Sequence, residues 1–329
     1  MKVLFIGGTG NISSAVSTLA LHNGIELFHL NRGKRAPSFA GVQTIVGDIT
    51  DPGIESRLKE HAWDAVVNWI AFEPKDVERD YRLFKGRTKQ YVFISSASIY
   101  QKPATSPFIT ESTPLANPFW LYSRNKIACE EALLTMYRND GFPITIVRPS
   151  HTYNTIIPYA IGGGSEYTTV DRIKKGKKVI VHGDGSSLWV MTHADDFAKG
   201  FLGLLGHQQA IGQAFHITSD EVLTWDQILQ AIAESVGATP HIVHIASETL
   251  VHFNADLTGD LIGDKTASVI FDNSKIKRFV PGFVATIPFR QGIKRTIDWF
   301  EEDPSRQIIK KETNEWIDTV LSKYEKLHA

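Results

Sequence analysis

A tyrosine and a lysine four residues apart, Tyr122 and Lys126, could together carry out acid–base chemistry. On a helix this spacing puts both side chains on one face. An ammonium beside a phenol favours the phenolate and lowers the pKa of the tyrosine. Such a tyrosine can act as general acid or base when a hydroxyl is converted to a ketone near neutral pH. The spacing alone is a weak signal, because it recurs by chance in surface helices.

Hydroxyl groups gather at the end of the apolar segment 90–95, where the sequence reads Ser95-Ser96-Ala97-Ser98. In an open α/β sheet, ligands bind beyond the carboxyl ends of the strands. A serine at such an end could hydrogen-bond the reacting oxygen of a substrate. The alternative for Ser95 and Ser98 is that they only cap the end of a strand.

The N-terminal residues 2–20 combine a short apolar strand, a glycine-rich turn and an amphipathic helix. The turn has the spacing G-x-x-G-x-x-S, in the sequence Gly7-Gly8-Thr9-Gly10-Asn11-Ile12-Ser13. Glycine lets the backbone approach a ligand closely, and the helix points free N–H groups at whatever lies in the turn. This arrangement predicts a site for a dinucleotide pyrophosphate. The alternative is a tight turn that binds nothing.

The predicted second strand, 25–31, ends where the adenosine ribose lies in dinucleotide-binding folds. An acidic residue there would hydrogen-bond a free 2′-hydroxyl and repel a 2′-phosphate. The sequence instead reads Leu30-Asn31-Arg32-Gly33-Lys34-Arg35, with no carboxylate and three cations. It therefore favours NADP, with NAD as the second choice. The alternative is a solvated basic loop.

Further apolar segments at 42–46, 65–70 and 90–95 read as strands, and they alternate with helical stretches such as 51–61 and 75–84. This order predicts an α/β fold, a Rossmann-type doubly wound parallel sheet. We expect this domain to span residues 1–150, with returning segments at about 188–218. Residues 151–187 and 219–329 would form a smaller, interleaved substrate-binding lobe.

Composition gives no sign of a nucleic-acid or membrane partner. The 329 residues carry a formal net charge of −1, and no apolar run approaches the roughly 20 residues of a membrane span. The single cysteine, Cys129, allows no internal disulfide and fits a reducing compartment. We therefore expect a cytoplasmic protein. The twelve histidines are scattered without a metal-binding spacing, so we predict no metal.

Together these residues resemble an extended short-chain dehydrogenase/reductase of the NAD(P)-dependent epimerase/dehydratase type, over nearly the whole chain. The resemblance implies that Ser96, Tyr122 and Lys126 are catalytic. It also implies that Asp48, after the third strand, contacts the adenine. The sequence Asn68–Ala71 matches the end of the fourth strand beneath the cofactor, and Arg148-Pro149 resembles the point where the chain leaves for the substrate lobe.

The residues expected to hold the cofactor lie in the glycine turn, at the ends of the predicted strands and on the tyrosine-bearing helix. They are Gly7, Thr9, Gly10, Asn11, Ile12, Asn31, Arg32, Asp48, Ile49, Asn68, Ile70 and Lys126. Four residues outside the catalytic set are expected to contact the substrate, although His151 could equally be a structural hydrogen-bonder and Trp189 part of the core. They are Ser98, His151, Tyr153 and Trp189.

The sequence departs from the family pattern at three places. Trp189 stands where sugar-nucleotide enzymes of the family carry an arginine, and an indole cannot clamp a diphosphate as a guanidinium does. Ala97-Ser98 replaces the Asp-Glu pair of the family's 4,6-dehydratases, which argues against that reaction. Only residues 72–89 separate the fourth and fifth strands, so the family's usual dimer helix is short and either a monomer or a homodimer is expected.

These features predict an NADP-dependent oxidoreductase or epimerase that acts on a hydroxyl or ketone of a sugar-like or other small molecule. One alternative is an RNA-binding or ribonucleolytic protein resembling the chloroplast stem-loop-binding proteins, whose phosphate contacts would come from the basic run Arg172–Lys178. Such a run is more often a solvated helix end, and nucleic acid is not the expected partner. A second alternative is a cofactor-sensing regulator that no longer turns over substrate.

Overall fold

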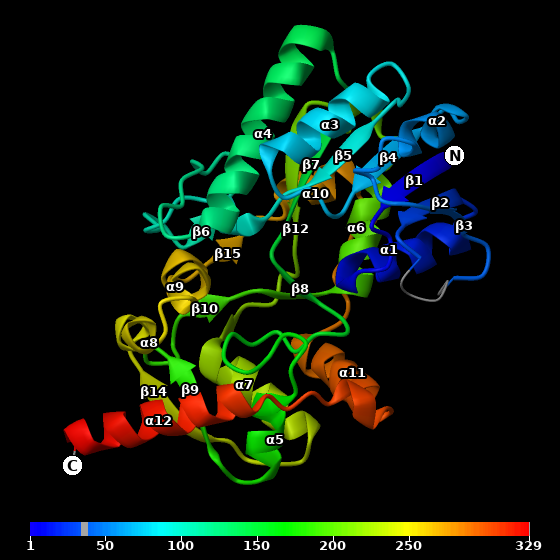
Figure 1. The fold of residues 1–329 in the computed structure, drawn as a ribbon. Coiled ribbons are helices and arrows are strands. Elements are labelled where there is room, and N and C mark those ends of the chain that lie inside the picture. The colour runs from blue at the N-terminus through cyan, green and yellow to red at the C-terminus, as the bar shows by residue number, and fades with distance from the viewer. Residues whose placement is uncertain (34–38, 329) are drawn as a thin grey trace.

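A seven-stranded parallel sheet forms the upper part of the computed structural model, which describes residues 1–33 and 39–328 (Figure 1). The strand order is β12-β7-β5-β4-β1-β2-β3. The strands are β1 (Lys2–Ile6), β2 (Glu26–Asn31), β3 (Gln43–Val46), β4 (Ala65–Asn68), β5 (Tyr91–Ile94), β7 (Ile144–Pro149) and β12 (Gln213–Ile217). The order reverses between β1 and β4, so the crevice for a ligand is expected beyond their carboxyl ends. The predicted fold class is confirmed.

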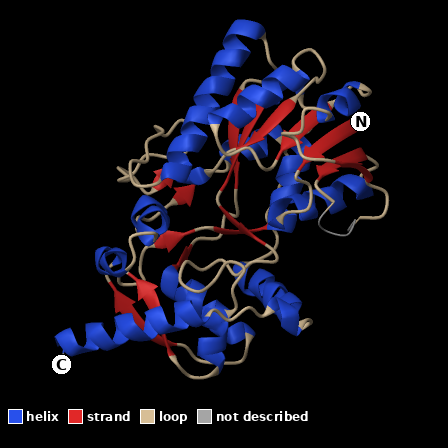
Figure 2. Ribbon diagram, in the orientation of Figure 1, coloured by secondary structure: helices blue, strands red, loops and turns tan. Residues whose placement is uncertain are grey.

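Helices cover both faces of the sheet (Figure 2). The helices around it are α1 (Asn11–His22), α2 (Ile54–Lys59), α3 (Pro74–Phe84), α4 (Leu121–Asp140), α6 (Ala194–Leu204) and α10 (Ser274–Phe279). Successive residues of a strand point to opposite faces. Val3 and Phe5 of β1 therefore pack with α1 and α6, whereas Leu4 and Ile6 pack with α3 and α4.

The lower part of the molecule has its own hydrophobic core, in which α7 packs against α11 and α5. Its helices are α5 (Thr168–Lys174), α7 (Trp225–Ser235), α8 (Ser247–Phe253), α9 (Leu257–Asp260), the π-helix η3 (Leu261–Lys265), α11 (Phe289–Glu301), η4 (Pro304–Arg306) and α12 (Lys311–His328). Two short 3₁₀ helices, η1 (Ala97–Ile99) and η2 (Gln208–Ala210), lie at the sheet. The short strands pair in twos: β6 (Phe108–Ile109) with β15 (Ile270–Phe271), β8 (His151–Tyr153) with β11 (Met191–His193), β9 (Lys178–His182) with β14 (His241–Ile245), and β10 (Leu188–Trp189) with β13 (Leu223–Thr224).

Two element boundaries differ from the sequence prediction. The expected helix 51–61 shortens to α2, because the main chain from Asp48 to Ile54 forms successive turns before the helix begins. The fourth strand ends at Asn68 rather than Ile70, because the Asn68 side chain accepts a hydrogen bond from the Ile70 N–H at 2.8 Å and turns the chain. Among the described residues, no helix is long and apolar enough to cross a bilayer.

A buried ion pair fixes α4 to the sheet. The Arg148 guanidinium on β7 donates two hydrogen bonds to the Glu130 carboxylate on α4, at 3.0 and 2.6 Å. Arg148 is 5% exposed and Glu130 is fully buried. Because α4 also carries Tyr122 and Lys126, this pair sets the position of the predicted catalytic helix.

We expect Arg148→Met to lower the free energy of unfolding by about 3–5 kcal/mol, because it leaves the Glu130 carboxylate buried without its partner. Urea unfolding followed by tryptophan fluorescence measures the change. The double variant Arg148→Met with Glu130→Leu removes both charges and should recover much of the loss. Equal destabilisation of the single and double variants would contradict this account.

Candidate active site

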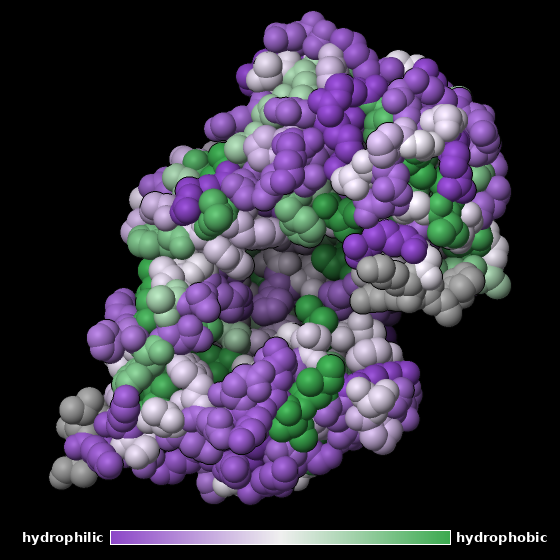
Figure 3. All heavy atoms as spheres, viewed as in Figure 1, coloured by the Kyte–Doolittle hydropathy of each residue, from purple (hydrophilic) through white to green (hydrophobic). Residues whose placement is uncertain are grey.

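Three adjoining cavities run between the sheet and the lower part of the molecule, where Figure 3 shows a hollow. The outer cavity, about 460 Å³, lies beyond β2 and β3. The central cavity, about 350 Å³, shares Gly7, Gly10, Ile70 and Phe72 with the outer one. The inner cavity, about 300 Å³, shares Ser96, Tyr122, Pro149 and Ser150 with the central one. The three therefore form one continuous groove.

The glycine turn lines the outer and central cavities. Gly7 has φ +82°, and a Cβ there would lie 2.6 Å from the Ile70 side chain, so only glycine fits. The Ser13 hydroxyl accepts a hydrogen bond from the Gly10 N–H at 2.8 Å and donates to the Gly7 carbonyl at 3.1 Å. Ser13 thus stabilises the turn. The tight backbone fits the close approach of a pyrophosphate.

The Asn11 side chain serves as a structural link between the turn and the chain after β7. It donates to the Thr152 carbonyl and accepts from the Thr155 N–H, each at 3.0 Å. Asn11 lines the central cavity as expected, but its amide is bonded to protein rather than left available. Ile12 lines the same cavity.

The ends of β2 and β3 supply the wall of the outer cavity. Thr9, Asn31, Arg32, Asp48 and Ile49 all line it. Hydrogen bonds from the main chain and side chain of Thr50 lower the pKa of Asp48, and the charge of Arg32 adds to this effect. The cations Lys34 and Arg35, on which the NADP prediction also rests, lie outside the described residues.

The Lys126 ammonium is held at the carboxyl ends of two neighbouring strands. It donates to the carbonyls of Ala71, after β4, and Ile94, of β5, both at 2.7 Å. Its Nζ also lies 4.6 Å from the centre of the Phe72 ring and 5.7 Å from that of Tyr122. Burial lowers the pKa of Lys126 to about 8. Lys126 lines the central cavity.

Tyr122 and Ser96 lie where the central and inner cavities meet. Burial raises the pKa of the Tyr122 phenol, and contact with Ser96 acts against this rise. The sequence predicted the opposite direction, from the charge of Lys126. Burial determines the direction of the Tyr122 pKa shift. The Lys126 ammonium donates hydrogen bonds to two main-chain carbonyls rather than to the phenol. The Ser96 hydroxyl is 2.9 Å from that of Ser98, which is 2.7 Å from that of Ser123 on α4.

Asn68, an expected cofactor contact, lines none of the three cavities. It is fully buried, and its side-chain amide donates to Asp80 while its carbonyl accepts from Ile70. Asp80 also accepts from the Tyr91 hydroxyl at 2.6 Å. Asn68 therefore positions Ile70, which does line the groove.

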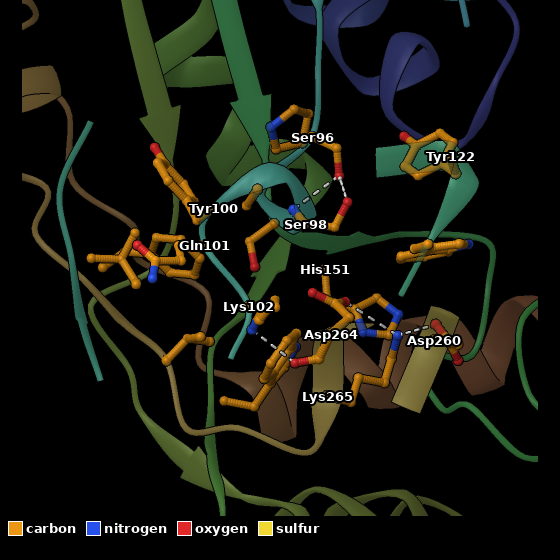
Figure 4. Close-up of a pocket in the computed structure, with 18 residues that line it drawn as sticks. Ser96, Ser98, Tyr100, Gln101, Lys102, Tyr122, His151, Asp260, Asp264 and Lys265 are labelled. Carbon is orange, nitrogen blue, oxygen red and sulfur yellow. Dashed lines mark hydrogen bonds and ion pairs between the residues drawn. The ribbon is translucent and has the colours of Figure 1, made fainter. Parts of the chain in front are cut away.

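Of the expected substrate contacts, Ser98, His151 and Trp189 line the inner cavity. Ser98 and His151 are labelled in Figure 4. Tyr153 does not line this cavity. It is fully buried, with its ring packed against Phe289 and His193 at 5.3 and 5.4 Å between ring centres. Because β8 pairs with β11 in the lower part of the molecule, Tyr153 points into the core there rather than into the groove.

Sequence reasoning missed four charged residues of the inner cavity: Lys102, Asp260, Asp264 and Lys265. In Figure 4 they lie opposite Ser96 and Ser98, with His151 between. Lys102 follows η1, whereas the other three come from α9 and η3, about 160 residues later. No periodicity or motif connects two such segments, so only the folded chain could reveal the cluster.

The basic run Arg172–Lys178 is largely neutralised by acidic residues. Arg172 is buried and donates to Asp318 at 2.7 Å. Lys174, Lys175 and Lys178 pair with Glu301, Asp171 and Glu325 at 2.6–2.8 Å. This arrangement does not favour the RNA-binding alternative.

The family model described as the NAD dependent epimerase/dehydratase family matches residues 3–218. The chain belongs to this family. The resemblance found in the sequence is therefore confirmed, as the glycine turn and the Y-x-x-x-K helix suggested.

Several known proteins resemble the chain over most of its length. Chloroplast stem-loop binding protein of 41 kDa b of Arabidopsis thaliana is 27% identical over 74% of this chain and 65% of its own length. The UDP-N-acetyl-alpha-D-glucosaminuronate decarboxylase of Bacillus cytotoxicus is 26% identical over 66% of this chain and 65% of its own. The aligned part thus spans slightly less than two thirds of both relatives. A solved UDP-glucuronic acid 4-epimerase of Bacillus cereus, with UDP-glucuronic acid and NAD bound, has the same fold, with a TM-score of 0.74 at 17% identity, over 92% of this chain and 99% of that one.

We expect Tyr122→Phe to remove most turnover, by a factor of about 10² or more, because the variant loses the group that would exchange a proton. Binding of the cofactor should change little, since the ring and its packing on Phe72 and Trp120 remain. Steady-state assays and fluorescence titration measure the two effects. The control is Tyr137→Phe, because Tyr137 is an exposed tyrosine on the same helix. Undiminished turnover of Tyr122→Phe would contradict its role.

Proposed function

We propose that this protein is an NADP-dependent oxidoreductase or epimerase that acts on a hydroxyl or ketone of a sugar-like small molecule. The observation that carries the proposal is the meeting of Ser96, Tyr122 and Lys126 around the central cavity, with Ser96 and Tyr122 also facing the inner one. The cofactor would occupy the outer and central cavities, and the substrate the inner cavity.

In this proposal the nicotinamide supplies or accepts the hydride. Lys126 holds the ribose and contributes positive charge to the central cavity. Ser96 donates a hydrogen bond to the substrate oxygen, and Tyr122 exchanges a proton with it. Because burial raises the pKa of Tyr122, its phenol is protonated at neutral pH and is ready to act as an acid toward a ketone. An adjacent cationic nicotinamide would favour the phenolate needed for the reverse reaction.

The comparisons support a sugar substrate. The names of two relatives specify UDP sugars, one of a decarboxylase and one of an epimerase. In the present chain, Trp189 replaces the arginine that would clamp a diphosphate, and the indole is 2% exposed and packs on Trp225 at 5.6 Å. We therefore favour a sugar-like substrate recognised through its sugar rather than through a diphosphate.

Two observations support NADP over NAD as the cofactor. Arg32 lines the outer cavity, and the strand before it, β2, ends at Asn31 rather than at a carboxylate. Titration with NADPH and NADH, followed by energy transfer from the seven tryptophans, tests this choice. Trp69 lines the central cavity and Trp120 the inner one, so both would report binding. We expect NADPH to bind at micromolar concentration and NADH much more weakly. Absence of binding by either would refute the proposed function.

Arg32→Asp should weaken NADPH binding by about tenfold or more, and should weaken it more than NADH binding, since only NADPH carries the 2′-phosphate. The same titration measures both affinities. Arg82→Asp, the same charge change at an exposed position of α3, controls for the altered net charge. An equal effect on the two cofactors would remove Arg32 from the 2′-phosphate site.

A further inference from the structure

Lys102 places a buried ammonium at the inner cavity without an ion-pair partner. The residue is 5% exposed, and its Nζ donates to the main-chain carbonyl of Asp264 at 3.0 Å. Within the described ranges 1–33 and 39–328, no carboxylate oxygen lies within 4.0 Å of this ammonium. Burial lowers the pKa of Lys102. A buried charge is costly unless it is paired, so this position favours a ligand that brings an anion.

The two carboxylates that line the inner cavity, Asp260 and Asp264, are already engaged by another cation. The Lys265 ammonium contacts the carboxylates of Asp260 and Asp264, the latter at 3.5 Å. Both aspartates raise the pKa of Lys265 against the effect of burial, so this lysine stays charged. Lys265 thus offsets one of these two negative charges, and Lys102 forms no ion pair within 4.0 Å with either carboxylate.

Two further groups of the inner cavity suit an anion. Trp189 is 2% exposed, and its indole N–H has no hydrogen-bond partner among the residues that the structure describes. The Lys102 Nζ lies 5.8 Å from the centre of the same indole ring, so the ammonium and the tryptophan are neighbours. Burial lowers the pKa of His151 to about 3, which leaves its imidazole neutral, and its Nδ1 also lacks a described partner.

The Lys102 segment is held in place before any ligand binds. The main-chain N–H groups of Gln101 and Lys102 donate to the carbonyls of Pro114 and Ala116 at 2.8 and 2.7 Å. The Asn117 side chain then donates to the Gly263 carbonyl of η3 at 2.7 Å, which ties the segment to the π-helix. A donor fixed in this way loses little conformational freedom when it binds.

We infer that Lys102 and the Trp189 indole N–H form a subsite for an oxyanion, a carboxylate or a phosphate, on the sugar-like substrate. Both groups donate hydrogen bonds, and a charge-assisted bond from an ammonium to an oxyanion is among the stronger kinds. The inner cavity is at the small end of the range for ligand pockets, which suits a single sugar ring. This inference rests on the proposed function, because it names the substrate class of the same cavity.

Calorimetric titration of the full-length protein with three sugars tests the subsite. The probes are D-glucuronate, which carries a carboxylate, D-glucose 6-phosphate, which carries a phosphate, and neutral D-glucose. We expect at least one anionic sugar to bind ten times more tightly than glucose, and the tighter of the two identifies the anion. Lys102→Met should abolish the preference and Trp189→Phe should reduce it. Lys311→Met, whose lysine side chain is 85% exposed, should leave it unchanged.

Equal binding of all three sugars, binding of none, or an unchanged preference in Lys102→Met would overturn the subsite. The near-ultraviolet circular dichroism of each variant shows whether it has folded, and Trp189→Phe gives an independent result if Lys102→Met has not. NADPH binding is measured separately. If NADPH binds but the sugar preference is absent, only the subsite fails. If the preference is present but NADPH does not bind, the proposed function fails and the subsite stands.

Discussion

The candidate site depends on the burial of the Lys126 ammonium at the carboxyl ends of β4 and β5. An ammonium away from water needs hydrogen-bond acceptors, and the carbonyls after β4 and on β5 supply two of them. These carbonyls are available because parallel strands end there and the chain turns away. The lysine thereby fixes the start of α4 against the sheet, and Tyr122, four residues earlier, is carried to the edge of the central cavity.

A second constraint is that segments distant in the sequence close the groove. Asn11 joins the glycine turn to the chain beyond β7, and Asn117 joins the chain after η1 to the π-helix η3. The Arg148–Glu130 pair secures the far end of the contact between α4 and the sheet. Each link uses a side chain to satisfy main-chain or charged groups that folding buries, so the walls of the groove are held by hydrogen bonds as well as by apolar packing.

Local sequence patterns predicted much of the lining of the outer and central cavities. Gly7 and Gly10 were assigned because a strand, a glycine turn and a helix follow one another directly, and both line the groove. Asn31 ends a predicted strand, and Arg32 and Asp48 each follow one. In a parallel sheet the carboxyl ends of the strands gather at one edge. Asn68 also ends a strand but lines none of the three cavities. Its position at a strand end was right, but its side chain turns back to bond Asp80, which no pattern of residue types specifies.

The α/β order of elements, the parallel sheet and the candidates Ser96, Tyr122 and Lys126 could be predicted from sequence patterns, because each pattern involves residues close together in the chain. Other features depend on how distant segments pack. Tertiary packing buried Tyr153 in the core and raised rather than lowered the pKa of Tyr122. It also brought Lys102 against Asp264, 162 residues away. Desolvation and long-range contact arise only when separate segments pack together, so they cannot be read from neighbouring residues.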